Sequence, residues 1–125
     1  LLDVPVGTAV FTENKWSSLK NAHITCLDYS IDMLDQARKR LGSHAHIKCI
    51  QGDVGNLQME NESVDTVVSM NGFHAFPDKQ KAFHEIWRVL KPGGDFIACF
   101  YPMRRKTPCF SYGDIRRVHR IYASN

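Results

Sequence analysis

Two aspartates in the sequence are spaced as in sites that bind a ribose. Asp28 follows the short apolar segment 23–27 and lies 25 positions after Asp3. Folds that bind dinucleotides or nucleosides place an acid at a similar spacing, where one carboxylate can accept hydrogen bonds from two vicinal hydroxyls. The alternative is a charge favoured by the positive end of a following helix, although Ser30 and Asp32 already supply that end. We therefore predict ribose binding for Asp28.

Three further loops carry groups that a nucleoside site would need. Gly7 in the loop 5–9 permits positive φ and lets a ligand approach the backbone, although an ordinary strand-to-helix turn would also use it. Asp53 could accept a hydrogen bond from an adenine amino group while Val54 packs against the ring; a Gly-Asp turn explains the pair equally well. Segment 69–74 places polar groups where a substrate and the reactive end of a cofactor would meet.

Apolar strands and helices alternate along the chain and would position these loops. We expect strands over residues 1–4, 23–27, 46–50, 64–70 and 96–101, and helices over 10–20, over 31–41 and after Asp78. Short links between such elements predict an α/β fold, with a Rossmann-like, doubly wound, mainly parallel sheet flanked by helices. Ligands bind outside the carboxyl ends of the strands in these sheets, so the loops after the first four strands should form one site.

The two clearest helices carry signals at both ends. Ser30 is the expected N-cap of helix 31–41, and Gly42 stands where a left-handed residue would end it. Asp78 should cap the later helix, which residues 91–94 end. Residues of this helix expected to face the core are Ala82, Phe83, Ile86, Trp87, Val89 and Leu90, and those expected to face outward are Lys79, Lys81, Glu85 and Arg88.

Composition restricts the class of protein. The 125 residues, 43% hydrophobic and 23% charged, fit one ordinary globular domain. No apolar run is long enough to cross a bilayer and no secretory leader is present, so we expect a cytoplasmic protein whose four scattered cysteines are reduced. The pair His44 and His46 lacks a neighbouring acid or thiol, so no metal site is expected.

Charge divides the chain into two parts. Residues 1–101 hold 10 Lys and Arg against 12 Asp and Glu, so we expect no nucleic-acid binding by this core domain. Residues 102–125 form a basic, unassigned tail with six Lys and Arg against Asp114 alone, and RNA binding by this tail is the alternative there. The tail is expected to form at most a short amphipathic helix, with Ile115, Val118, Ile121 and Tyr122 on one face. Because the chain opens within a strand and without Met, we also expect it to begin inside a longer sequence.

Five short motifs together carry a family likeness. They are Leu2-Asp3-Val4-x-x-Gly7-Thr8, Leu27-Asp28-Tyr29-Ser30-x-x-Met33-Leu34-x-x-Ala37-Arg38, Gln51-Gly52-Asp53, Val64-Asp65-Thr66-Val67-Val68 and Glu85-x-x-Arg88-Val89-Leu90-Lys91-Pro92-Gly93-Gly94. In type, order and spacing they resemble class I S-adenosylmethionine-dependent methyltransferases over about residues 1–101. The branch they resemble is the small-molecule type of ubiquinone and menaquinone biosynthesis.

The resemblance implies S-adenosyl-L-methionine as cofactor and a small-molecule methyl acceptor as partner. The cofactor-binding residues that it implies are Asp3, Val4, Pro5, Gly7, Asp28, Tyr29, Met33, Asp53, Val54 and Asn71. The first four belong to the loop at the methionine part, Asp28 would bind the ribose, and Asn71 would lie near the transferable methyl. Tyr29 and Met33 would pack near the adenine, and Asp53 would bind it with Val54 beside it. Residues 91–94 have a structural role in this family.

Two departures from the family pattern bear on activity. Pro5 and Ala9 replace the outer glycines of the family loop Asp-x-Gly-x-Gly-x-Gly, and proline removes one backbone N–H. The C-terminal antiparallel hairpin of the family sheet is missing from the sequence pattern. A truncated or non-catalytic relic that still binds the cofactor is therefore the alternative function. An NAD-dependent oxidoreductase is a further rival, but it would use three loop glycines where this chain offers Gly7 alone.

The reaction implied is direct in-line displacement of the methyl group by the acceptor. The sulfonium is an activated leaving group, so the protein mainly supplies alignment and exclusion of water. A base is needed only if the acceptor must lose a proton. His74, in the loop after the fourth strand, is the candidate catalytic base by position and by the ordinary pKa of histidine, although a bystander role fits a single loop histidine as well.

Overall fold

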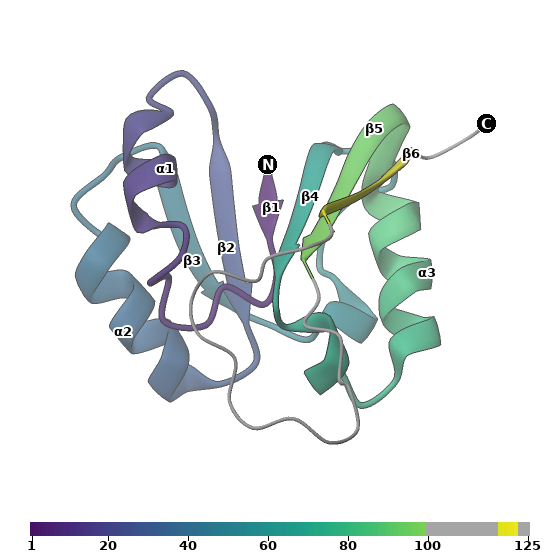
Figure 1. The fold of residues 1–125 in the computed structure, drawn as a ribbon, viewed down its shortest axis with the longest axis horizontal. Coiled ribbons are helices and arrows are strands. Elements are labelled where there is room, and N and C mark those ends of the chain that lie inside the picture. Colours follow the sequence, from purple (N-terminus) through teal and green to yellow (C-terminus); the bar gives the residue numbers. More distant parts are fainter. Residues whose placement is uncertain (100–117, 123–125) are drawn as a thin grey trace.

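A six-stranded sheet forms the centre of the computed structural model, which describes residues 1–99 and the backbone of 118–122 (Figure 1). In chain order its elements are β1 Leu2–Asp3, α1 Glu13–Ser18, β2 Ile24–Asp28, α2 Ile31–Leu41, β3 Ile47–Gln51, β4 Val64–Met70, α3 Lys79–Val89, β5 Leu90–Cys99 and β6 Val118–Tyr122. Two short 3-10 turns, η1 Val54–Asn56 and η2 Phe73–Ala75, follow β3 and β4. The strand order is β3-β2-β1-β4-β5-β6, and all neighbours except β5 and β6 are parallel. The expected α/β class with a mainly parallel, doubly wound sheet is confirmed.

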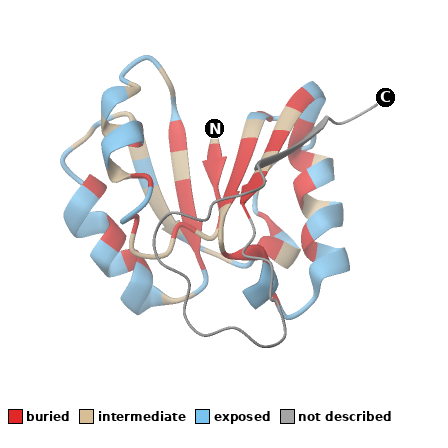
Figure 2. Cartoon of the chain, viewed as in Figure 1, coloured by how far each residue is buried: buried red, intermediate tan, exposed pale blue. Residues whose placement is uncertain are grey.

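Helices cover both faces of the sheet, and each face has its own apolar core (Figures 1 and 2). Alternate residues along a strand point to opposite faces, so Val67 joins the core under α3 while Val68 joins the core under α1 and α2. From α2, the apolar residues Leu34, Ala37 and Leu41 are fully buried. The two cores hold the strand ends, and hence the loops that follow them, in fixed positions.

The bounds of α2 and β4 are as predicted, and so are the N-caps of α2 and α3. Ser30 caps α2, its hydroxyl oxygen accepting a hydrogen bond from the Met33 N–H at 3.4 Å, and Asp78 caps α3 through the Lys81 N–H at 3.0 Å. Gly42 does not adopt the expected left-handed conformation. Its φ is −67°, and its N–H donates to the Arg38 carbonyl oxygen, so the backbone continues in helical geometry past Leu41.

The first helix is shorter than predicted, because the backbone before Glu13 turns. Ala9 has a φ of 62°, and its carbonyl oxygen accepts hydrogen bonds from the N–H groups of both Thr12 and Glu13. Residues 10–12 therefore form turns instead of the first turn of the expected helix 10–20. Val10 is left 51% exposed at the carboxyl edge of the sheet.

Two predictions about the face of α3 are wrong. Phe83 and Trp87 are each 37% exposed, although they touch Phe96 at ring-centroid distances of 5.9 and 6.5 Å. Glu85 and Arg88, expected to face outward, are half-buried because they bond to the loop after η1.

The fifth strand begins at Leu90, earlier than the expected 96, and a register shift accompanies this start. Val64 pairs with Leu90 and Thr66 with Asp95, so residues 91–94 bulge between the pairs. Gly94 is needed there, since a Cβ would lie 2.9 Å from the Asp65 carbonyl oxygen. Phe100 and Tyr101, expected to end this strand, lie outside the described residues.

The expected C-terminal helix is wrong where the structure describes this part of the chain. Residues Val118–Tyr122 form β6, which pairs antiparallel with β5 from Cys99↔Val118 to Asp95↔Tyr122. The edge of β5 offers unpaired backbone groups, and β-branched and aromatic residues favour strands, so pairing replaces the helix. The remaining tail residues, 102–117 and 123–125, lie outside the described residues, and the domain boundary near 101 stays a prediction.

Candidate functional site

The loops after the first four parallel strands meet at the carboxyl edge of the sheet, as predicted. The Gly7 N–H donates to Asp28 Oδ2 at 2.8 Å, which joins the β1 loop to the end of β2. The Gly52 N–H donates to the Asp28 carbonyl oxygen at 3.0 Å, which joins the β3 loop to the same residue. The Pro5 ring contacts Gly72 of the β4 loop. Asp28 is therefore the residue around which the site is assembled.

Asp28 is buried and uses both carboxylate oxygens. Oδ2 accepts from Gly7, and Oδ1 accepts from the Ser30 N–H at 2.9 Å. A carboxylate offers about four acceptor positions. Two therefore remain for the ribose hydroxyls that the sequence predicts, while the helix-end interaction weighed as the alternative is present as well.

Asp3 lies at the end of β1 and is almost fully buried. Its Oδ2 accepts a hydrogen bond from Trp16 Nε1 at 2.7 Å, and its Oδ1 has no partner within the described part of the chain. Burial raises the pKa of Asp3 to about 6, the Trp16 bond and the nearby Thr12 hydroxyl oppose this rise, and the Asp28 charge adds to it. An acceptor oxygen without a donor is available to a polar ligand group.

The loop 5–9 has Gly7 where the family pattern has three glycines. Gly7 has a φ of 58°, as predicted, and no atom of the described residues lies within 4 Å of the position that a Cβ would take. Ala9 adopts the same left-handed region, where an L-residue costs about 1 kcal/mol. Pro5 fills the space beside Gly72, so no side chain fits at position 72 without movement. The backbone at Gly7 thus faces open space where a ligand can approach.

Asp53 and Val54 begin η1 after the third strand. Asp53 Oδ1 accepts from the Gly55 N–H at 2.8 Å, which is the turn chemistry considered as the alternative. The Asp53 side chain is exposed, but Val54 is buried in the core under α3. Only the backbone of Val54 or the edge of its side chain could then contact an adenine ring. The Val4 side chain is likewise buried in that core, and its N–H donates to the Val68 carbonyl oxygen.

Two exposed side chains at the start of α2 could cover an aromatic ring. Tyr29 is 77% exposed and Met33 is 44% exposed, both beside Asp28. The Tyr29 carbonyl oxygen accepts a hydrogen bond from Gln51 Nε2 at 3.1 Å, which ties this segment to the end of β3. Exposed apolar side chains beside the Asp28 carboxylate fit a nucleoside better than they fit a purely polar ligand.

Asn71 and His74 follow β4 and differ in setting. Asn71 has a φ of 54°, its N–H donates to the Cys99 carbonyl oxygen, and its buried Oδ1 has no partner among the described residues. His74 lies in η2 with its side chain exposed. Asn71 therefore offers a buried acceptor, whereas the His74 side chain lies in solvent.

Sequence reasoning missed three side chains that shape the site. Trp16 holds α1 against Asp3, and Arg88 with Glu85 holds the loop after η1. The motif Glu85-x-x-Arg88 carried a signal, since an acid and a base three positions apart on a helix can pair. No local pattern marked Trp16 as a hydrogen-bond donor to a residue 13 positions away.

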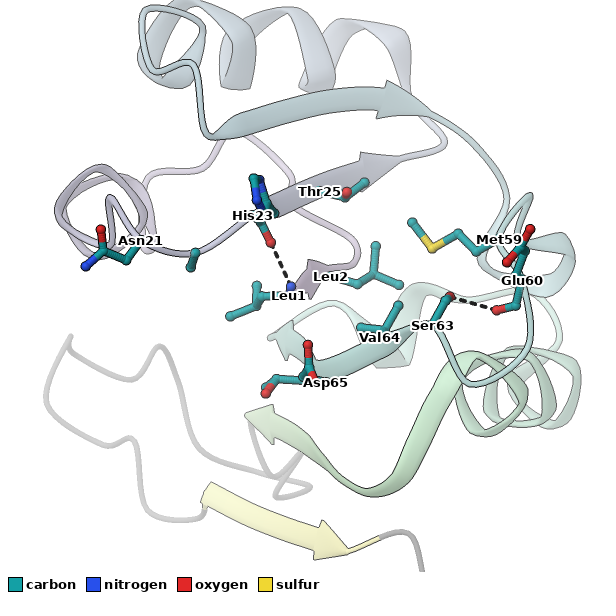
Figure 3. Close-up of a pocket in the computed structure, with 12 residues that line it drawn as sticks. Leu1, Leu2, Asn21, His23, Thr25, Met59, Glu60, Ser63, Val64 and Asp65 are labelled. Carbon is teal, nitrogen blue, oxygen red and sulfur yellow. Dashed lines mark hydrogen bonds between the residues drawn. The ribbon is translucent and has the colours of Figure 1, made fainter.

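A separate pocket opens at the amino ends of the strands, where β1 is much shorter than its neighbours (Figure 3). Leu2, Thr25 and Val64 line it, and the Leu1 amino group donates to the His23 carbonyl oxygen at 2.8 Å. None of the predicted site residues lines this pocket. Because doubly wound sheets bind ligands at the opposite edge, we assign function to the carboxyl edge.

Two searches of the described residues bear on metals and membranes. Residues 1–99 and 118–122 contain no group of three or more His, Cys, Asp or Glu that could hold a metal ion. In the same part of the chain, no helix combines the length and apolar character needed to cross a bilayer.

Comparison with known proteins gives a family match over most of the chain. A sequence family described as a methyltransferase domain matches residues 1–94. A demethylmenaquinone methyltransferase of Staphylococcus epidermidis is 34% identical over 122 residues, which cover 97% of this chain and 48% of that protein. The chain thus spans about half the length of this curated relative.

Solved structures share the fold. An S-adenosylmethionine-dependent methyltransferase of Aquifex aeolicus superposes with a TM-score of 0.74 over 86% of this chain and 60% of its own, at 19% identity, which shows the fold alone. The cyclase SpnF superposes with a TM-score of 0.70 at 25% identity, over 79% of this chain and 37% of its own. The same architecture therefore occurs in proteins named for different reactions.

Proposed function

The chain belongs to the S-adenosylmethionine-dependent methyltransferase family, and from that premise we propose that it binds S-adenosyl-L-methionine and transfers the methyl group to a small-molecule acceptor. The observation that carries this proposal is the meeting of Gly7, Asp28 and Asn71 at one sheet edge. Within the described part of the chain, Gly7 faces open space, Asp28 keeps free acceptor positions, and the Asn71 acceptor oxygen has no partner. Such a set of acceptors fits the hydroxyls of a ribose and the ammonium of an amino-acid end.

Each group has a role in holding the cofactor. Asp28 would accept hydrogen bonds from the ribose hydroxyls, and the exposed faces of Tyr29 and Met33 would cover the adenine. Asp53 would accept from the adenine amino group. The unpartnered oxygens of Asp3 and Asn71 would accept from the ammonium of the methionine part. The attraction between a buried carboxylate and a cation is strong, because little water screens the two charges.

The bound cofactor supplies an activated methyl on a sulfonium, so the protein needs to align the acceptor and keep water out. Gly7 lets the reactive end lie close to the backbone, and the Pro5–Gly72 contact limits the space beside it. His74 is the proposed base for an acceptor that must lose a proton. From its exposed position it would pass that proton to solvent.

The name of one relative supports a proposal for the class of acceptor. A family member that is similar to this chain over 122 residues is named for demethylmenaquinone, a quinone-type ring. We propose an aromatic or quinone-type small molecule as the acceptor.

Calorimetry with S-adenosylhomocysteine and with NAD tests the cofactor assignment. We expect binding of the first and none of the second, with Asp28→Ala abolishing it and Ser18→Ala, a distant exposed residue, leaving it unchanged. Binding of NAD in preference would refute the assignment. Transfer of labelled methyl from S-adenosyl-L-methionine to a panel of quinols and phenols then tests turnover.

A cofactor-binding protein without methyl transfer is the second candidate, and two observations favour it. Pro5 occupies space beside Gly72, and SpnF shares the fold although it is named a cyclase. Tight binding of S-adenosylhomocysteine without transfer to any acceptor in the panel would select this candidate.

A further inference from the structure

We propose that Glu85 and Arg88 of α3 are positioning residues, which hold the loop after η1 in the shape that presents Asp53 to the adenine. The inference rests on the proposed function, because it assumes a nucleoside at the carboxyl edge. It is carried by a set of hydrogen bonds between one helix and a segment that has no helix or strand of its own, residues 57–63.

Every N–H of the Arg88 guanidinium has an acceptor. Nε and one Nη2 hydrogen donate to Glu85 Oε1 and Oε2, each at 2.8 Å. The three remaining bonds go to the loop: Nη2 to the Leu57 carbonyl oxygen at 2.9 Å, and Nη1 to the Met59 carbonyl oxygen and to Asn61 Oδ1, both at 2.8 Å. Arginine has five such donors in a fixed fork, so this arrangement uses all of them.

Glu85 also bonds to the loop, so Glu85 and Arg88 together form a clamp on residues 57–63. Its Oε2 accepts a hydrogen bond from the Leu57 N–H at 2.8 Å, so both backbone groups of Leu57 are bonded to the pair. The Arg88 bonds hold the pKa of Glu85 below its usual range, with burial opposing. The carboxylate therefore stays charged, and bonds between charged partners are stronger than neutral ones.

The clamp reaches Asp53 through one short turn. Leu57 directly follows η1, and Asp53 caps the start of η1 through the Gly55 N–H, while the Asn56 N–H donates to the Asp53 carbonyl oxygen at 3.0 Å. Fixing Leu57 therefore fixes the far end of the three-residue turn that Asp53 begins. Within the described residues, only Oδ1 of Asp53 is used in this cap, so the second oxygen can meet a ligand.

A role in overall stability alone would make a different prediction from positioning. Loss of a purely structural bond lowers affinity for all ligands through the folded fraction, whereas loss of positioning changes which purine is preferred. We therefore compare S-adenosylhomocysteine with S-inosylhomocysteine, in which an oxo group replaces the adenine amino group that Asp53 would bind.

The experiment measures dissociation constants for both ligands by calorimetry, using the whole chain. A hydrogen bond to a charged acceptor predicts that the wild-type chain prefers the adenine ligand by about 10- to 100-fold. We expect Arg88→Met to reduce that preference to about threefold or less, as Asp53→Ala does, and Arg88→Lys to restore only part of it, since lysine lacks the fork. Leu41→Val is the matched control, because Leu41 is fully buried in the opposite core and should lower thermal stability without changing the preference.

The outcomes separate the inference from the function on which it rests. An unchanged preference in Arg88→Met, or an equal loss in Leu41→Val, overturns the inference. A wild-type chain that binds both ligands equally also overturns it and leaves the proposed function standing. If the wild-type chain binds neither ligand, the proposed function is refuted. The part of the inference that concerns adenine is then refuted as well.

Hydrogen exchange without ligand tests the clamp itself. The amides of Gly55 and Leu57 should exchange at least tenfold faster in Arg88→Met or Glu85→Gln, while the Ser30 amide, held by Asp28, keeps its rate. Uniform acceleration of all three amides shows a loss of global stability and overturns the clamp.

Discussion

Replacement of Asp3 by asparagine should stabilise the fold at pH 8 and lose this advantage as the pH falls. Asp3 is buried, and its pKa rises from an ordinary value of 3.8 to about 6. The folded state therefore binds the Asp3 proton more tightly than the unfolded state does. The stability that this group contributes is fully present below pH 3.8 and is lost as the pH rises through 6.

The size of the effect follows from the two pKa values. A rise from 3.8 to about 6 corresponds to about 3 kcal/mol of stability lost between those pH values. Asparagine removes the charge and keeps an oxygen for the 2.7 Å bond from Trp16 Nε1, and the preference of this bond for the charged carboxylate is already included in the pKa of about 6. We expect Asp3→Asn to be more stable than the wild-type chain by about 3 kcal/mol at pH 8, by about 1.5 kcal/mol at pH 5, which lies midway between the two pKa values, and by about zero only below pH 3.8.

Urea unfolding followed by far-ultraviolet circular dichroism at pH 8, 7, 6 and 5 measures this difference without relying on Trp16 fluorescence. Asp65→Asn is the control, because the bond from Lys91 lowers the pKa of the exposed Asp65. Stability from such a group is lost only as the pH falls below the ordinary value of 3.8, so the control difference should stay constant from pH 8 to pH 5. A constant difference for Asp3→Asn over the same range would refute the raised pKa. A less stable Asp3→Asn chain at pH 8 would show that the Trp16 bond outweighs burial.

Three further substitutions test the site. Asp28→Ala removes the acceptor of the Gly7 N–H and should cost about 1–3 kcal/mol in urea unfolding, whereas an unchanged midpoint would contradict the role of Asp28 in holding the loop. Gly72→Ala should clash with the Pro5 ring, and the double variant with Pro5→Gly should recover at least half of the lost stability; additive losses would show that the contact is unimportant. His74→Gln should lower the turnover number and leave the dissociation constant of S-adenosylhomocysteine unchanged, and equal turnover would remove His74 as the base.

Elements with local signals were predictable from the sequence, and elements set by distant contacts were not. Helix α2 has an N-cap serine and apolar residues at helical spacing, and its bounds match the prediction. Strand β4 matches as well, because a run of apolar residues marks it. Strand β6 was missed because it pairs with the free edge of β5, whose residues lie 19 to 27 positions earlier in the chain. The bounds of α1 were wrong because the φ of Ala9 decides them.

The same division holds for the site. The position of Asp28 at the meeting of the loops follows from the rule that parallel strands end at one edge, and its hydrogen bonds confirm that position. The bond of Trp16 to Asp3 and the fork of Arg88 around Leu57 join residues 13 and 31 positions apart. Neither periodicity nor spacing in one sequence indicates such pairs, because a charged helix residue usually lies in solvent.

The altered glycine loop is compatible with cofactor binding, because other residues take over what the lost glycines would do. Ala9 holds the left-handed conformation that a glycine would hold at lower cost, and the Asp28 carboxylate fixes the Gly7 N–H. Pro5 is the one change with a steric effect, since its ring fills the space beside Gly72. The effect of this change falls next to Asn71, at the proposed methionine side of the site, and away from Asp28, at the proposed ribose side. Binding of the nucleoside and transfer of the methyl group should therefore respond separately to Pro5→Gly, with the turnover number changing more than the dissociation constant of S-adenosylhomocysteine.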